Sequence, residues 1–171
     1  MNMEISKEEL QEAQHDLKKL IHKTSVLSSS AINTIAEADI FFKCENFQKT
    51  GSFKARGASN ALIKLSPAEQ KLGVATHSSG NHGQALAWAA QRLGIKCWVV
   101  MPENSPAVKV AAVKSYGAVV HLCAASLPAR EAGLKEVQQD TGALFIPPYN
   151  HRNIIIGQST AAAELLAEEP Q

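Results

Sequence analysis

Residues 45–58 read ENFQKTGSFKARGA. Gly51 permits a sharp turn in this stretch, and Ser52 is expected to cap a helix whose first turn carries Lys54. The positive end of the helix dipole and partial burial both favour the neutral lysine amine, which is the nucleophilic form that makes Schiff bases. The stretch therefore predicts a reactive lysine, with an ordinary solvated lysine as the alternative.

The same stretch resembles the lysine segment of the fold-type-II pyridoxal-phosphate enzymes, the group that contains threonine dehydratase, serine racemase and cysteine synthase. Their pattern is a Lys-x-Glu strand end, a turn, and then Gly-Ser-Phe-Lys-x-Arg-Gly-Ala. The matching residues are Lys43, Glu45, Gly51, Ser52, Phe53, Lys54, Arg56, Gly57 and Ala58. The resemblance implies that Lys54 forms the Schiff base with pyridoxal phosphate and that Phe53 lies close to the cofactor ring.

A second motif, HSSGNHGQ at residues 77–84, follows an apolar run and precedes a helical pattern. Unpaired N–H groups at a helix start attract anions such as a carboxylate, although a Ser/Gly/Asn start is often only a cap. The motif resembles the Ser-x-Gly-Asn-His-x-Gln loop of the same enzymes. The resemblance implies that Asn81 binds the oxygen on the cofactor ring, and that Ser78, Asn81 and His82 hold the substrate carboxylate.

Ser79 is the candidate for a second catalytic residue. Racemisation needs a proton to leave one face of the substrate α-carbon and another to arrive on the opposite face, and Lys54 serves only one of them. The resemblance favours serine racemase, because many threonine dehydratases carry alanine at this position. The alternative is a small loop hydroxyl without a role. By the same resemblance, Arg130 lies at the position of an arginine that reaches the substrate in serine racemases. The alternative is an ordinary surface residue of a helix.

The remainder of the chain alternates short apolar runs with helical patterns. Strands are expected at 73–77, 96–101, 118–123 and 143–146, and helices at 83–93, 106–116 and 128–139. This alternation predicts an α/β fold, an open parallel sheet with helices on both faces. The resemblance makes it a fold-type-II, tryptophan synthase beta-like sheet. Further elements are expected at 6–22 (helix), near Ser30 (a short helix), 39–44 (strand), 53–65 (helix) and 157–169 (helix).

The resemblance also implies a division of the chain and a truncation. Residues 1–51 would be the N-terminal part of a large domain, 52–146 a small α/β domain, and 147–171 the start of the returning large-domain segment. The family continues beyond this end, with a Gly-rich phosphate loop, a residue facing the pyridine nitrogen and metal ligands that this chain lacks. Residues 148–150 resemble the family segment that lines the edge of the cofactor, and residues 155–160 resemble the family's entry to the next helix. Two residues depart from the pattern: Pro147 replaces a usual histidine, and Ser159 replaces a glycine.

Composition narrows the class of protein. The chain has 171 residues, 45% of them hydrophobic, and a net charge of +1. This balance gives no basic field for nucleic acid, and no apolar run approaches the roughly 20 residues that span a bilayer. The three cysteines are expected to be reduced core thiols, and the six histidines form no metal constellation. We therefore expect a cytoplasmic protein that acts on small molecules.

The expected function is that of a serine racemase or serine (threonine) dehydratase-like protein, which acts on small hydroxy amino acids through Lys54 and pyridoxal phosphate. The resemblance allows Mg²⁺ and ATP as additional ligands of full-length family members. A threonine dehydratase is a close alternative. A third hypothesis is a catalytically incompetent truncated form that binds or modulates a full-length subunit, and a homodimer is also an option. A nucleotide-binding module is disfavoured, because no Gly-x-Gly-x-x-Gly loop follows a strand.

Overall fold

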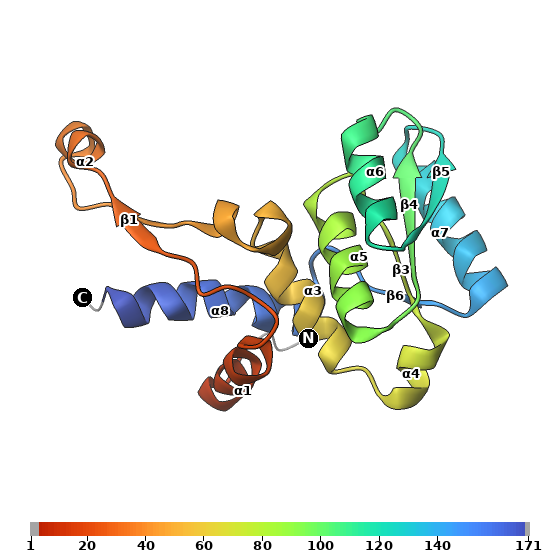
Figure 1. Ribbon diagram of the computed structural model, residues 1–171, viewed down its shortest axis with the longest axis horizontal. Coiled ribbons are helices and arrows are strands. Elements are labelled where there is room, and N and C mark those ends of the chain that lie inside the picture. Colours follow the sequence, from red (N-terminus) through yellow and green to blue (C-terminus); the bar gives the residue numbers. More distant parts are fainter. Residues whose placement is uncertain (1–3, 170–171) are drawn as a thin grey trace.

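The computed structural model describes residues 4–169. Its main sheet has four parallel strands in the order β5-β4-β3-β6 (Figure 1). The strands are β3 (Val74–His77), β4 (Cys97–Pro102), β5 (Val119–Cys123) and β6 (Leu144–Phe145). Each lies within one residue of its predicted bounds, and the predicted open parallel sheet is confirmed.

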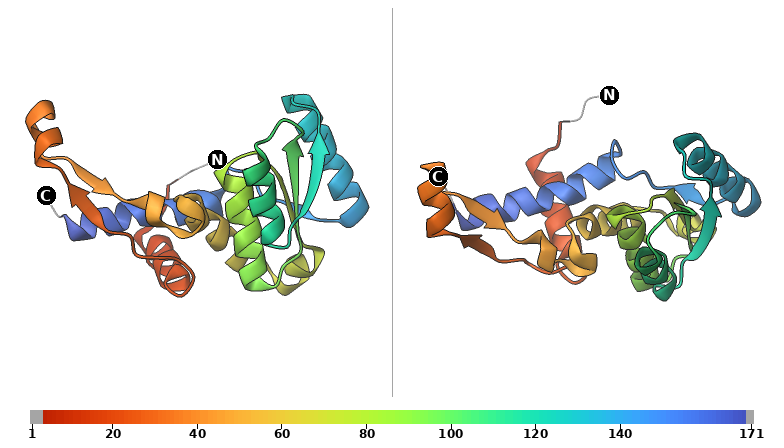
Figure 2. Two further views of the ribbon diagram at one scale, coloured as in Figure 1. Left: turned by 45° about the horizontal axis from the view of Figure 1, so that its top comes forward. Right: turned by 90° about the horizontal axis from the view of Figure 1, so that it is seen from above.

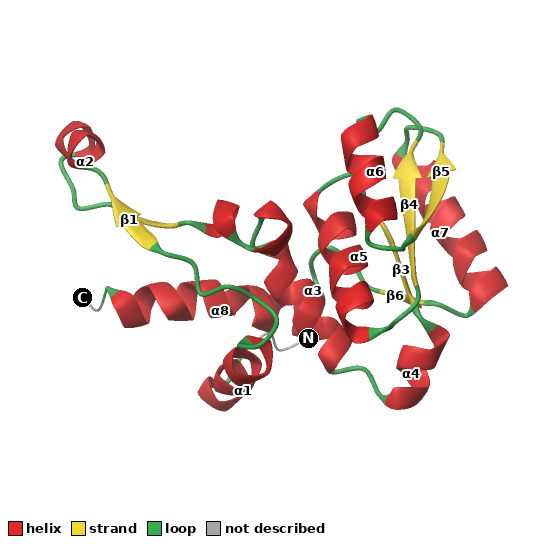
Figure 3. Ribbon diagram, viewed as in Figure 1, coloured by secondary structure: helices red, strands yellow, loops and turns green. Residues whose placement is uncertain are grey.

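Helices cover both faces of this sheet (Figure 3). They are α5 (Asn81–Leu93) and α6 (Ala107–Ser115) on one face and α7 (Leu127–Thr141) on the other. Side chains of a strand alternate between the faces, so Val74 packs in the core beneath α5, whereas Ala75 packs beneath α7. We call β3–β6 with these three helices the lobe.

The N-terminal helix α1 (Lys7–Leu17) begins with the expected capping box but is shorter than predicted. It was expected to continue to residue 22. Instead, the side chain of Gln48 accepts a hydrogen bond from the backbone N–H of His22 and donates one to its carbonyl. This contact with a distant part of the chain holds His22 outside a helix, and the helical pattern of Leu20 and Ile21 does not reveal it.

Residues 26–43 form an arm that projects away from the lobe (Figures 1 and 2). It consists of β1 (Val26–Ser28), α2 (Ser30–Ala36) and β2 (Phe41–Lys43), with the two strands paired antiparallel. Ser29 caps α2, which confirms the short helix expected near Ser30. The pairing strand β1 was not predicted, because three residues carry too short a pattern.

Helices α3 (Lys54–Ile63) and α8 (Arg152–Glu168) cross closely at two glycines. A Cβ on Gly157 would lie 2.7 Å from the Arg56 carbonyl oxygen and from the Gly57 Cα. The prediction that the last helix begins at Gly157 is wrong. It begins five residues earlier, because isoleucines before Gly157 belong to the helix face that packs on α3: Ile154 and Ile156 are buried.

A buried ion cluster ties α3, α8 and the base of the arm together. The guanidinium of Arg56 is fully buried and donates paired hydrogen bonds to the carboxylates of Glu45 and Glu164. Lys43, the last residue of β2, contacts Glu164 at 3.0 Å and Glu168 at 2.9 Å. The arm is thus fastened to α8 mainly by charge.

A short helix, α4 (Pro67–Leu72), connects α3 to β3. It starts with Pro67 at its first turn and has a full capping box between Ser66 and Glu69. Within residues 4–169 no helix is both long and apolar enough to cross a membrane.

Candidate active site

Lys54 is the first residue of α3 and follows a tight corner. The corner is a 3-10 turn, Lys49–Gly51, in which Gly51 has a φ of 71°. The expected cap by Ser52 is wrong: Phe53 occupies the N-cap position and forms no side-chain cap. The hydroxyl of Ser52 is buried and has no partner among the described residues, so this polar atom is left over at the corner.

The amine of Lys54 points toward the segment that follows β6. Its Nζ donates a 2.8 Å hydrogen bond to the carbonyl oxygen of Pro148 and lies 5.2 Å from the centre of the Phe53 ring. Burial lowers the pKa of Lys54, because a charged amine is less well solvated there. A lysine in this state has the larger share of neutral amine that nucleophilic attack on an aldehyde requires.

The loop at 78–80 joins β3 to the start of α5. Gly80 is the N-cap of α5, and the first N–H groups of a helix have no partner inside it. Gly83 allows the loop to fold back on the helix, since a Cβ there would lie 2.8 Å from the Ser78 carbonyl oxygen. At Gly80 a Cβ would meet no atom within 4 Å, so the backbone borders open space.

The loop side chains differ in the hydrogen bonds that they form. The Ser78 hydroxyl accepts a hydrogen bond from the N–H of Gly80. Ser79 is half-buried and forms no side-chain hydrogen bond with any described residue. Asn81 is exposed, and its Oδ1 accepts a 3.2 Å hydrogen bond from the amine of Lys109. Ser79 and Asn81 are therefore accessible to a ligand, and Lys109 is a neighbour that the motif does not indicate.

The imidazole of His82 points into the protein. Its Nε2–H donates a 3.0 Å hydrogen bond to the carbonyl oxygen of Ile146, so the Nδ1 of the neutral ring carries no proton and has no partner among the described residues. Burial lowers the pKa of His82 to about 4, and the nearby charge of Lys54 adds to this effect. The ring thus links the loop to the segment after β6, and what it offers to a ligand is its backbone N–H. Its predicted side-chain role toward a carboxylate stays a prediction.

A cleft of about 390 Å³ lies on the α7 side of the β3 end. The ring of His77 stacks on Phe145 at one wall, with ring centres 5.7 Å apart. Burial lowers the pKa of His77, and the charge of Arg130 on α7 contributes. The Nε of Arg130 is buried and has no hydrogen-bond partner within residues 4–169. Sequence reasoning named Arg130 but not its neighbour His77, although that residue opens the HSSGNHGQ motif.

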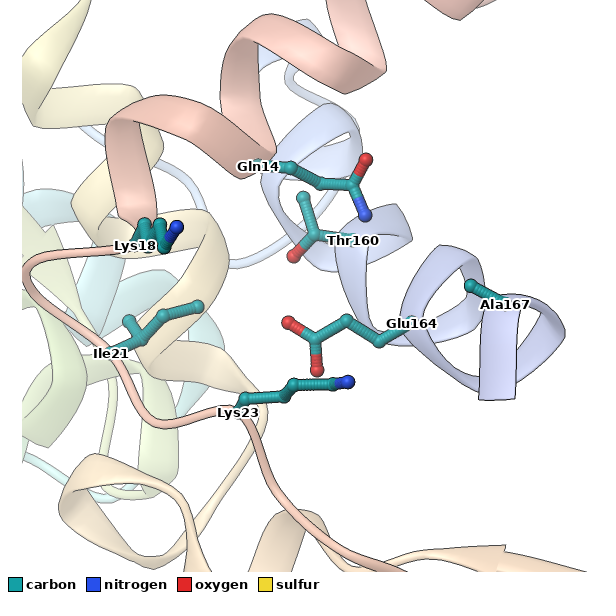
Figure 4. A pocket seen from close by; sticks show the side chains of 7 residues that line it. All are labelled: Gln14, Lys18, Ile21, Lys23, Thr160, Glu164 and Ala167. Carbon is teal, nitrogen blue, oxygen red and sulfur yellow. The ribbon is translucent and has the colours of Figure 1, made fainter. Parts of the chain in front are cut away.

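Another hollow, of about 290 Å³, lies between α1 and α8 (Figure 4). Its lining side chains include Gln14, Thr160 and Glu164, and none comes from the loop or the Lys54 corner. It is therefore separate from the candidate active site. Across residues 4–169, no group of three or more His, Cys, Asp or Glu side chains is placed to hold a metal ion.

Three segments distant in sequence thus converge: the lysine corner, the loop and the segment after β6. The family model described as "Pyridoxal-phosphate dependent enzyme" matches residues 17–171. The chain belongs to this family, whose cofactor is pyridoxal phosphate.

Individual relatives place the chain near the serine racemases. It is 46% identical to the serine racemase of Dictyostelium discoideum over 164 residues, covering 96% of this chain and 51% of the relative. The crystal structure of that enzyme matches with a TM-score of 0.91, covering 96% of this chain and 53% of the other. The beta-hydroxyaspartate dehydratase of Paracoccus denitrificans is 44% identical and covers 94% of this chain and 51% of the relative. The chain therefore spans about half the length of the relatives it matches.

The residues present fit the aldehyde end of pyridoxal phosphate. The Lys54 amine has a lowered pKa, an aromatic ring stands beside it, and an unpartnered buried hydroxyl, that of Ser52, lies two residues away in the chain. The accessible amide of Asn81 supplies a hydrogen-bond donor on the neighbouring loop. These groups would hold the reactive part of the cofactor, whereas the resemblance assigns the phosphate cradle to a later part of the family sequence.

Proposed function

We propose that this chain carries the lysine half of a pyridoxal-phosphate site that acts on small hydroxy amino acids, with serine as the first candidate. The observation that carries the proposal is the Lys54 amine, held 2.8 Å from the Pro148 carbonyl oxygen, with a pKa lowered by burial. The nearby loop supports it, because its helix-start N–H groups suit a substrate carboxylate.

Each residue has a distinct task in the proposed reaction. The chemistry that pyridoxal phosphate supplies when bound is an electron sink for the bond broken at the substrate α-carbon. Lys54 holds the cofactor and moves a proton on one face of that carbon, and Ser79 moves a proton on the other face. Phe53 and Asn81 position the cofactor. Ser78, Asn81, His82 and Arg130 hold the substrate.

Racemisation and elimination of water share the first step, loss of the α-proton. If Ser79 returns a proton to the opposite face, the product is D-serine; if the hydroxyl leaves instead, the products are pyruvate and ammonia. Ser79→Ala should therefore suppress D-serine formation more than pyruvate formation. A threonine dehydratase-like protein would show no such difference and would prefer L-threonine. Measuring both products from both substrates separates these two functions.

Covalent labelling tests the lysine directly. The chain is incubated with pyridoxal phosphate and treated with borohydride, and the labelled peptides are mapped by mass spectrometry. We expect preferential labelling of Lys54, and its loss in Lys54→Arg, which keeps the charge but not the nucleophile. Equal labelling of exposed lysines such as Lys71 and Lys96 would contradict the proposal.

A second candidate function is association with another polypeptide of the family, without turnover by this chain alone. It is favoured by the exposed apolar side chains of the arm. Size-exclusion chromatography with and without a family partner tests this function. A chain that stays monomeric and binds none of the partners would exclude it. A cytoplasmic location is also proposed, supported by the three free cysteines.

A further inference from the structure

The two end strands of the lobe sheet differ in how their free edges are protected. The strand β6 is two residues long, and Pro147 and Pro148 follow it closely. The strand β5 is five residues long and contains no proline, lysine, arginine, aspartate or glutamate. Short strands, prolines and charges are the means by which proteins prevent a sheet edge from pairing with another chain. Of the described lobe strands, only β5 therefore has a free edge without this protection (Figure 1).

Both faces of β5 expose an apolar side chain. Leu122 is 54% exposed and lies on the α6 side, where it lines a hollow of about 400 Å³ beside that helix. Val119 is 56% exposed and lies three residues earlier, so its side chain is on the α7 side. A strand that paired along this edge would cover part of both side chains, because cross-strand neighbours on each face are in contact.

The hollow beside α6 carries one charge of each sign, at opposite ends of β5. Glu103 lies at the C-terminal end of the strand, because its N–H donates a 2.8 Å hydrogen bond to the Cys123 carbonyl oxygen. Lys114 lies in the last turn of α6, and the short turn at 116–118 joins that helix to the N-terminal end of β5. Both side chains line the hollow, are exposed and form no ion pair within the described part of the chain. The edge is thus complementary in charge to a reversed copy of itself.

We propose that β5 pairs antiparallel with β5 of a second copy of this chain. The symmetry is a two-fold axis perpendicular to the sheet, which keeps α6 of both copies on the same face. The C-terminal end of each strand then lies beside the N-terminal end of the other. Glu103 of each copy therefore faces Lys114 of the other copy, and the two ion pairs are related by the symmetry axis.

The register of this pairing is centred on His121. Because His121 is the middle residue of β5, this register pairs all five residues of each strand. Leu122 lies opposite Val120 of the other copy on the α6 side, and Val119 lies opposite Cys123 on the α7 side. The two lobes then share one continuous sheet. This contact is independent of the proposed cofactor site, because none of its residues comes from the lysine corner, the loop or the segment after β6.

Sedimentation velocity across a range of concentrations measures the self-association. We expect a dimer that dissociates on dilution. Leu122→Lys places a charge on the open edge and should weaken the dimer by about 100-fold. The matched control is Leu27→Lys, because Leu27 is 53% exposed but lies on the arm. This control should leave the dimer unchanged.

Charge reversal tests the antiparallel arrangement. Glu103→Lys and Lys114→Glu each place like charges together in the dimer, and each should weaken it by about 10-fold or more. An equal mixture of the two variants should form a heterodimer about as stable as the unchanged dimer. The reason is that each reversed side chain then meets the opposite charge in the other copy.

Four results would overturn the proposal. The first two are a chain that stays monomeric at its highest soluble concentration and a dimer that Leu122→Lys does not weaken. The others are a dimer that Leu27→Lys weakens as strongly as Leu122→Lys, and a mixture of the two charge variants that gains no affinity. Circular dichroism confirms that each variant folds, and Val119→Lys replaces Leu122→Lys if that variant does not.

Discussion

The lobe and the arm are both small sheets, yet they are stabilised in opposite ways. The four strands of the lobe have helices on both faces, and residues such as Val99 and Leu86 are fully buried. The two strands of the arm keep apolar side chains in water and are held to α8 by Lys43 and the Arg56 cluster. The comparison teaches that the lobe contains its own core, whereas the arm is held to the rest of the chain largely by charge.

The largest expected effect comes from breaking the ion cluster at the base of the arm. Arg56→Ala leaves the partly buried carboxylate of Glu45 without its cation and leaves Glu164 with Lys43 alone, and should lower the free energy of unfolding by about 3–5 kcal/mol. Arg152→Ala, which breaks an exposed pair with Glu9, should cost at most about 1 kcal/mol. Urea denaturation measures both, and equal losses would mean that charge does not anchor the arm.

A leucine-to-alanine substitution in each region compares how much buried side chains contribute to the stability of the lobe and of the arm. Leu86→Ala opens a cavity in the lobe core and should cost about 2–5 kcal/mol. Leu27→Ala removes a side chain that is already 53% exposed and should change the stability of the free chain by less than about 0.5 kcal/mol. A large loss for Leu27→Ala in denaturant titrations would show that the arm is covered in the free chain.

Acid should destabilise the protein through His82. Burial lowers its folded-state pKa to about 4 from 6.5, so the unfolded state binds the extra proton. Stability from this group is therefore complete above about pH 7 and is lost as pH falls from 6.5 toward 4. The loss between pH 7 and pH 4.5 should be about 2–3 kcal/mol. His82→Asn should flatten this dependence in urea titrations, and an unchanged slope would refute the assignment.

A further effect is expected at the crossing of α3 and α8. Gly157→Ala forces a Cβ against the backbone of α3 and should cost about 1–3 kcal/mol. Gly80→Ala is the control, because a Cβ there meets no atom, and thermal melting should hardly change. If Gly157→Ala is equally neutral, the helices have room to separate.

The sequence predicted the lobe well because strand and helix periodicity are local signals. The apolar runs before and after the HSSGNHGQ motif gave four strand positions, and the two motifs gave Lys54 and the loop. The wrong helix bounds come from contacts between residues that are far apart in the sequence. The hydrogen bonds of Gln48 to His22 end α1 early, and packing on α3 places Ile154 in a helix. The cap expected from Ser52 failed because Phe53 takes the N-cap position. The roles of the site residues and the three-part domain division stay predictions.

The most direct test of the lysine site is a visible absorbance titration of the chain with pyridoxal phosphate. Lys54→Ala and the exposed-lysine variant Lys96→Ala are run beside it, to subtract adventitious reaction at the surface. The account predicts a saturable band that disappears in Lys54→Ala and persists in Lys96→Ala. A band of equal size in Lys54→Ala would contradict it.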